Sequence, residues 1–145
     1  MFKHILLPVD GSPTAACAVD KALVIAEAFK SAVSLIYVID PYAFTGVGTD
    51  LSYGQAEYLS AATAEGNEAL RQARQVFEAR GIEVSSAVVE GHAVYRTILD
   101  AAQAGHADLI VMGSHGRHGL EKLILVSVTA QVLSHAHLPV LVVRD

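Results

Sequence analysis

The chain contains 145 residues, of which 52% are hydrophobic and 17% charged, so it can bury a core and lies far from the composition of disordered proteins. We expect one compact domain over residues 1–145. Ten Lys and Arg against fifteen Asp and Glu give a formal charge of −5, which repels nucleic-acid backbones and anionic lipid and argues against a nucleic-acid or membrane-surface binder.

Cysteine content and the N-terminal residues indicate a cellular compartment. Cys17 is the only cysteine, which excludes an intrachain disulfide and a cysteine-ligated metal cluster. The first residues lack the long apolar segment and the small-residue cleavage site of a signal peptide, and no apolar run approaches the length of a membrane span. We therefore expect a cytoplasmic protein.

Five short runs rich in β-branched residues and leucine predict strands, and longer segments of helical period separate them. The runs span residues 5–9, 33–39, 84–89, 109–112 and 140–143. They are mainly apolar and show no regular alternation with polar residues, which is typical of parallel strands covered by helices on both faces; for the last run the position in the sheet stays open. The predicted fold class is α/β, with an open, doubly wound, parallel five-stranded sheet and helices on both faces.

Four helices are predicted between these strands. The first begins at the N-cap Ser12 with Pro13 as its first residue, and the third ends at Gly105. The second ends at Gly81. The helices span residues 12–26, 56–80, 93–104 and 127–135. The glycine- and tyrosine-containing stretch 41–55 is predicted as a loop, either a lid over a ligand or an ordinary packed surface loop.

The turns after the first and fourth strands are the candidate ligand site, because ligands of such sheets bind beyond the carboxyl ends of the strands, where the winding direction reverses. Asp10 ends an otherwise apolar strand, where a carboxylate needs partners or a solvated cleft. It could accept hydrogen bonds from a ribose or hold Mg²⁺ near phosphates. The structural alternative is that Asp10 caps the turn to Ser12.

The turn after the fourth strand, residues 112–119, has glycine at every third position. Backbone amides in such a turn can approach an anion closely, and Arg117 and Lys122 with two histidines add local positive charge. The turn matches neither the Walker A pattern nor GxGxxG, so phosphate binding and a purely structural loop both remain open.

With these two turns placed, the chain resembles the universal stress protein family along nearly its whole length. Residues 5–12, which read ILLPVDGS, look like the family's first strand and turn, and residues 109–116 and 138–143 look like its C-terminal signature. The resemblance implies a small five-stranded domain of the adenine nucleotide alpha hydrolase-like type. It also implies a homodimer and, in one branch, binding of ATP or related adenine nucleotides.

The nucleotide-binding branch is marked by glycine, two residues, glycine, nine residues, and then glycine followed by serine or threonine. Gly113, Gly116 and Ser127 match this pattern, but Val126 stands where the third glycine belongs. A β-branched side chain there adds bulk close to the anion, and a positive φ would strain it. Val126 would therefore weaken triphosphate binding, shift preference toward AMP, or abolish binding.

The resemblance implies a set of nucleotide-binding residues, with Mg²⁺ accompanying the phosphates near Asp10. They are Pro8, Val9, Asp10, Val38, Met112, Gly113, His115, Gly116, Val126, Ser127 and Val128. We expect the base near Val38 and Met112 and the ribose near Asp10.

The last strand is an edge strand by the same resemblance, and an uncovered apolar edge favours antiparallel pairing with a second copy. The predicted dimer interface is Val140, Leu141, Val142 and Val143. The alternative is that the charged Arg144 and Asp145 blunt the edge.

The sequence predicts neither a catalytic residue nor a metal site of the protein's own. Ser114 and His115 are adjacent and do not form the Gly-x-Ser-x-Gly elbow of a hydrolase. The histidine pairs lack the cysteines or clustered carboxylates of a closed four-ligand site. Two functional alternatives to nucleotide binding stay open: a nucleotide-free dimeric interaction module, favoured by Val126, and a weak ATPase or phosphotransferase.

Overall fold

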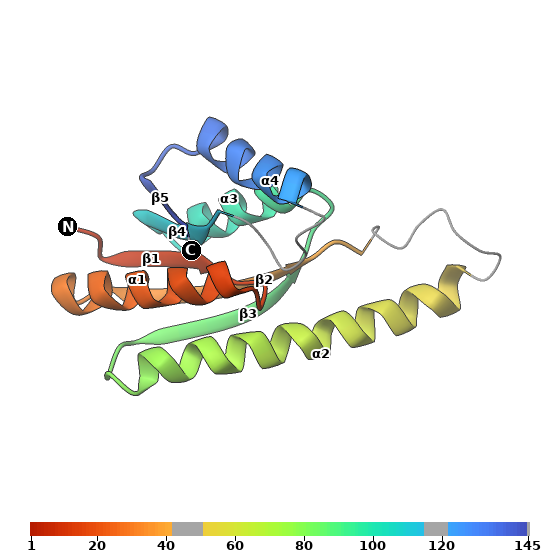
Figure 1. Ribbon diagram of the computed structural model, residues 1–145, viewed down its shortest axis with the longest axis horizontal. Helices are drawn as coiled ribbons and strands as arrows, with labels where there is room; N and C mark the ends of the chain where they lie inside the picture. The colour runs from red at the N-terminus through yellow and green to blue at the C-terminus, as the bar shows by residue number, and fades with distance from the viewer. Residues whose placement is uncertain (42–50, 115–121, 145) are drawn as a thin grey trace.

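The computed structural model describes residues 1–41, 51–114 and 122–144, with the backbone alone at 51–53, 55 and 122–127. Its strands form one all-parallel sheet in the order β3-β2-β1-β4-β5 (Figure 1). The strands are β1 His4–Pro8, β2 Ala32–Ile39, β3 Val84–Glu90, β4 Leu109–Gly113 and β5 Val140–Val143. This confirms the predicted fold class and places the last strand at an edge of the sheet.

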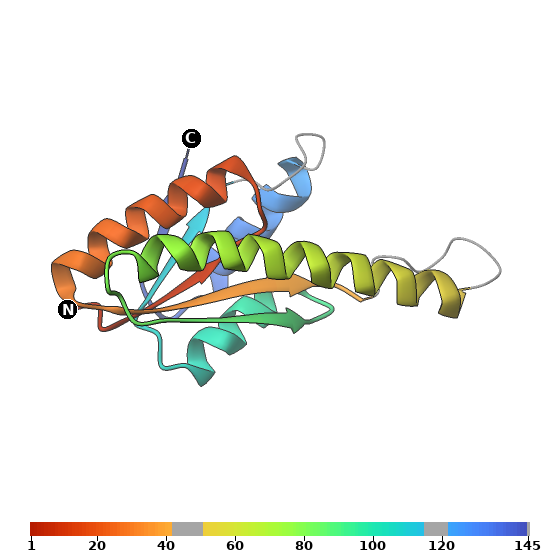
Figure 2. The ribbon, with the colours of Figure 1, turned by 90° about the horizontal axis from the view of Figure 1, so that it is seen from below.

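Two helices cover each face of the sheet (Figures 1 and 2). Helices α1 (Pro13–Phe29) and α2 (Leu51–Glu78) lie on one face, and α3 (Val94–Ala104) and α4 (Lys122–His135) on the other. Because side chains alternate along a strand, each face has its own core. One core joins Leu7, Leu35 and Val111 to Phe77 of α2, and the other joins Leu6, Ile36 and Ile110 to Ile98 of α3 and Val132 of α4.

The prediction of helix cover on both faces holds for the central strands β1, β2 and β4, and it is wrong for β3. Every residue of β4 from Leu109 to Met112 is buried, whereas Ser85, Ala87 and Glu90 of β3 are exposed. Strand β3 lies at the edge beyond β2, and the core under α3 includes β1 and β2 residues but only Val89 of β3. Its alternating exposure is therefore that of a strand with one solvated face.

The start of α1 and the end of α2 follow the predicted capping signals. Ser12 has extended backbone angles and accepts a hydrogen bond from the Ala15 amide at 3.1 Å, with Pro13 following it. Gly81 has φ +70° in the turn that leads from α2 toward β3. These local signals fix where α1 begins and where α2 ends.

The starts of α2 and α4 correct two predicted boundaries. Helix α2 begins at Leu51 rather than at residue 56, so residues 51–55 of the predicted loop are helical; residues 42–50 lie outside the described residues. Gly54 costs helix stability relative to alanine, by about 1 kcal/mol, but does not end a helix. Helix α4 begins at Lys122 rather than at residue 127.

The amino edge of the sheet is held by Asp108, the residue before β4. Its carboxylate accepts the backbone amides of Lys3 at 2.8 Å and His4 at 3.0 Å. Burial raises the pKa of the Asp108 carboxyl, but the hydrogen bonds from His4 and Lys3 lower it by more, so the net pKa lies below 3.8. This contact fixes β1 against β4 at the edge opposite the candidate site.

Candidate functional site

The carboxyl ends of β1 and β4 meet at the point where the winding of the sheet reverses. From β1 the chain passes to β2 and β3 on one side, and then to β4 and β5 on the other. Residues Ile5 and Leu6 pair with Leu109 and Ile110 in parallel register. The turns that follow β1 and β4 therefore leave the sheet side by side, as the strand-order rule requires of a ligand crevice.

The turn after β1 is organised by Asp10. Its Oδ1 accepts the backbone amide of Ser12 at 2.9 Å across Gly11, which has φ +80°. Asp10 therefore caps this turn, as the structural alternative in the sequence analysis predicted. The second carboxylate oxygen makes no hydrogen bond to any residue within the described ranges. A half-buried carboxylate with one oxygen fixed and one open can accept hydroxyl groups of a ligand.

The turn after β4 begins against the first turn of α1. A Cβ atom added to Gly113 would lie 3.1 Å from the backbone carbonyl carbon, the carbonyl oxygen and the Oγ1 atom of Thr14. A Cβ atom at this position would require the start of α1 to shift by a few tenths of an ångström, so glycine favours the close approach of β4 and α1. The end of β4 and the start of α1, about a hundred residues apart in the chain, therefore lie side by side. Asp10 lies in the turn that connects β1 to α1.

The side chains of the other candidate residues divide between the two faces of the sheet. Val38 and Met112 pack in the core under α3 and α4, and Val128 of α4 packs against the same core. Val9 packs in the core under α1 and α2, so it could contribute only its backbone to a site on the opposite face. Pro8, the last residue of β1, is half-buried.

The glycine-rich turn can be followed only in part. His115 and Gly116 lie outside the described residues, as do Arg117 and His118. Val126, Ser127 and Lys122 lie within α4, where the backbone alone is described. Because residues of an α-helix have negative φ, the positive-φ strain considered for Val126 does not arise, and side-chain bulk is the remaining argument.

Three residues at this edge escaped the sequence analysis. Thr14 is buried, and its backbone meets Gly113. Asp40 follows β2 and lies 3.6 Å from His92, measured between Oδ1 and Nδ1. Asp40 gives the same signal that identified Asp10, a carboxylate directly after an apolar strand, and could have been found by it. Nothing in the sequence around Thr14 marks its contact with β4.

Among the described residues, no group of three or more His, Cys, Asp or Glu side chains could hold a metal ion. No described helix combines the length and apolar character needed to cross a membrane. The arrangement described at this edge offers one open carboxylate oxygen, the half-buried apolar side chain of Val38 near the buried Met112, and a glycine close to the start of a helix.

Comparisons with known proteins give a consistent result. Residues 1–144 match the model of the universal stress protein family. A universal stress protein of Methanocaldococcus jannaschii is 37% identical over 144 residues, covering 99% of this chain and 83% of the relative. The solved universal stress protein UspA of Lactobacillus plantarum is 32% identical with a TM-score of 0.83, over 99% of this chain and 98% of the other.

A more distant solved relative carries a ligand. The universal stress protein of Archaeoglobus fulgidus in complex with dAMP is 19% identical, with a TM-score of 0.69 over 99% of this chain and 98% of the other. At this identity the likeness to our chain is one of fold.

Proposed function

Because this chain belongs to the universal stress protein family, we propose that it is a stress-response module that binds an adenine nucleotide at the carboxyl edge between β1 and β4. We further propose that residues 1–145 act as a single domain and that the protein works in the cytoplasm. The contact between Gly113 and Thr14 carries the proposal, because it holds the end of β4 beside the segment that follows β1. The dAMP complex of the Archaeoglobus fulgidus relative supports an adenine nucleotide as the ligand class.

We assign the base, the ribose and the phosphates of the nucleotide to separate groups of residues at this edge. The adenine ring would pack against the half-buried Val38 and reach Met112, and ribose hydroxyls would donate to the open oxygen of Asp10. The phosphates, with Mg²⁺ as their counterion, would meet the glycine-rich turn and α4. The residues assigned to the phosphates are Gly113, His115, Gly116, Ser127 and Val128, and Pro8 and Val9 contribute backbone atoms.

Calorimetric titration with ATP, ADP and AMP in the presence of Mg²⁺ tests the proposal. We expect saturable binding of at least one of the three, and we expect Val126→Gly to raise the affinity for ATP by about fivefold or more. The reason is that removing the side chain frees space for the terminal phosphates and lets the backbone approach them. Absence of binding by both the natural chain and Val126→Gly overturns the proposal.

Two further variants separate the causes of a gain. Val126→Ala removes the branched side chain and keeps a good helix former, so a gain in both variants assigns the effect to bulk. Leu133→Gly places glycine at an exposed position of α4 away from the crevice. It should lose about 1 kcal/mol of stability without changing nucleotide affinity.

We also propose that the protein is a homodimer joined by antiparallel pairing of two β5 strands. The Ile110 amide donates to the Pro139 carbonyl at 3.0 Å and the Ser114 amide to the Val143 carbonyl at 2.9 Å. Odd-numbered residues of this segment therefore pair with β4, and the N–H and C=O groups of Val140 and Val142 point outward, since these groups alternate along a strand. Leu141 is 38% exposed at the same edge.

Val142→Pro is expected to convert the dimer to a monomer. Proline removes an outward N–H that a second copy would use and leaves the hydrogen bonds to β4 in place. Val142→Thr is the matched control, because it keeps the N–H and the branched side chain and should remain dimeric. Size-exclusion chromatography with light scattering measures the mass. A monomeric natural chain, or a Val142→Pro variant that stays dimeric, contradicts this interface.

A further inference from the structure

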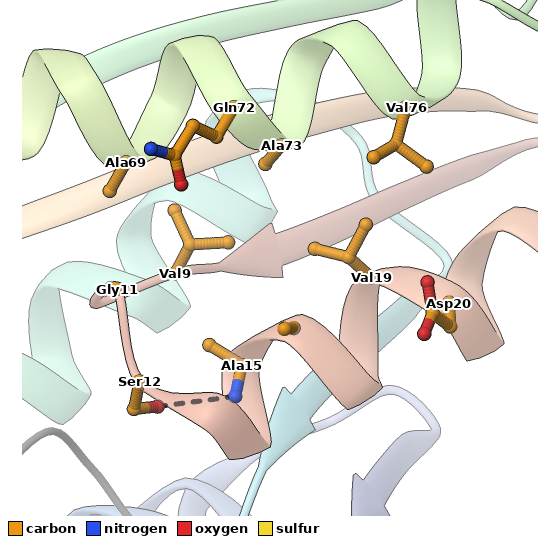
Figure 3. A pocket seen from close by; sticks show the side chains of 11 residues that line it. Val9, Gly11, Ser12, Ala15, Val19, Asp20, Ala69, Gln72, Ala73 and Val76 are labelled. Carbon is orange, nitrogen blue, oxygen red and sulfur yellow. Dashed lines mark hydrogen bonds between the residues drawn. The ribbon is translucent and has the colours of Figure 1, made fainter.

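A groove separates α1 from α2 above the end of β1, on the face of the sheet away from α3 and α4 (Figure 3). Its volume is about 250 Å³. Pockets that hold drug-sized ligands measure about 300–1,000 Å³, so this groove suits a smaller molecule, with a short aliphatic chain or a single ring.

The base of the groove is apolar. Val9, Val19 and Ala73 form it and are themselves buried, with 6%, 5% and 7% of their surface exposed. Val76 of α2 adds a further branched side chain, directed toward α1 (Figure 3). An aliphatic or aromatic body placed here would exchange water for contacts with these side chains, which favours binding at about 25 cal/mol per Å² of apolar surface covered.

The polar groups around the groove discriminate between charges. At the Ser12 end, the Ser12 amide is bonded to Asp10 and the Ala15 amide to Ser12 Oγ, so these donors are already occupied. Gln72 donates its amide to Glu68 at 3.0 Å. Among the residues whose side chains the structure describes, no lysine, arginine or histidine lines the groove.

Asp20 is the one ionisable residue lining the groove within the described ranges. It makes no hydrogen bond or ion pair with any residue in the described part of the chain. Its carboxylate side chain is the negatively charged group at the groove. An anion in the groove would meet this charge and find the Ser12 and Ala15 amides occupied, whereas an ammonium group would meet an unneutralised carboxylate.

We propose that the groove between α1 and α2 binds a small amphiphilic organic cation, with its apolar body on Val9, Val19 and Val76 and its ammonium group at Asp20. The site is separate from the proposed nucleotide crevice. The Val9 side chain lies on the α1 and α2 face of the sheet, and the Val38 and Met112 side chains lie on the opposite face. The inference therefore stands whether or not the chain binds a nucleotide.

Three probes with the same six-carbon body test the charge preference: hexylammonium, 1-hexanol and hexanoate. Each is titrated into the full chain while the methyl resonances of Val9, Val19 and Val76 are followed by NMR. We expect hexylammonium to bind about two- to fivefold more tightly than hexanol, as for partly exposed ion pairs, and hexanoate to bind more weakly than hexanol. Equal binding of all three probes, or tighter binding of hexanoate, overturns the proposal.

Asp20→Asn should lower the affinity for hexylammonium to that for hexanol and leave hexanol binding unchanged. Asp100→Asn makes the same charge change at an exposed position of α3 and should have no effect. If both variants lose hexylammonium affinity equally, the preference reflects overall charge and the assignment to Asp20 is wrong.

Ala16→Leu tests the location. Ala16 lines the groove and is exposed on α1, so leucine fills the groove from its open side without entering the core. Binding of hexylammonium and hexanol should fall at least about tenfold. Ala28→Leu, at an exposed position of α1 outside the groove, is the matched control and should bind as the natural chain does. Retained binding in Ala16→Leu places the probes elsewhere and overturns the proposal.

Discussion

Replacing Asp10 with asparagine is expected to weaken adenine-nucleotide binding about ten- to a hundredfold and to leave the fold intact. The amide oxygen of asparagine can accept the Ser12 amide as Asp10 Oδ1 does at 2.9 Å, so the turn persists. The open carboxylate oxygen, which would accept the ribose hydroxyls, is lost. A hydrogen bond to a charged group contributes about 1.5–3 kcal/mol, which corresponds to the expected change in affinity.

The measurement is calorimetric titration of both proteins with the nucleotide that binds the natural chain most tightly, together with thermal unfolding without ligand. Asp100→Asn is the matched control, since it makes the same substitution at an exposed position of α3. Its nucleotide affinity should stay within about twofold of the natural value. Unchanged affinity in Asp10→Asn would show that Asp10 serves only the turn.

The sequence was sufficient to predict the architecture and the meeting of the turns after β1 and β4, because both depend on strong local patterns. The apolar runs with their intervening helical segments predict parallel strands, and the strand-order rule then brings the turns after β1 and β4 together. Asp10 stood out because a carboxylate directly after a buried strand is costly without a partner. Asp40 also follows an apolar strand directly. A carboxylate in this position therefore marks the carboxyl edge of the sheet, but it does not by itself identify a residue that contacts a ligand.

Close contacts between elements that are distant in the sequence could not be predicted. Gly66 fits the apolar stripe of α2, yet its position reflects the ring of Tyr37 on β2: a Cβ atom there would lie 2.7 Å from Tyr37 Cδ1. Likewise, Gly113 belongs to a recognisable pattern, but its contact with Thr14 depends on how α1 packs against β4. Such positions are set by tertiary packing, which periodicity does not encode.

Helix starts without a capping signal were the least predictable boundaries. The start of α1 was found because Ser12 and Pro13 mark it. The starts of α2 at Leu51 and α4 at Lys122 lie further upstream than the hydrophobic period alone indicated. The earlier start of α4 bears on function, because it places Val126 in the helix and not in the preceding loop. The bulk of the Val126 side chain, and not backbone strain, is then the reason that Val126 would oppose phosphate binding.

The largest loss of stability is expected for Phe77→Ala, at about 3–5 kcal/mol in the free energy of unfolding. Phe77 is fully buried in the core between α2 and the sheet, and its loss leaves a cavity that the neighbouring strands cannot fill. Phe29→Ala is the matched control: Phe29 is 44% exposed and contacts Phe2 edge-on at 5.5 Å between ring centroids. It should lose about 1 kcal/mol. Urea unfolding at 25 °C measures both, and equal losses would contradict the assignment of Phe77 to the core.

Phe77→Ala also separates the stability of the core from the integrity of the nucleotide site. Phe77 lies near the end of α2, where its carbonyl accepts the Ile82 amide at 3.1 Å just before β3, and hence near the amino edge of the sheet. The proposed nucleotide site lies at the carboxyl edge. A nucleotide at a hundred times its Kd should therefore add about 2.7 kcal/mol to the free energy of unfolding of both the natural chain and Phe77→Ala. A much smaller gain in Phe77→Ala would mean that the crevice is assembled by the packing of α2 over its whole length, rather than by the two turns after β1 and β4.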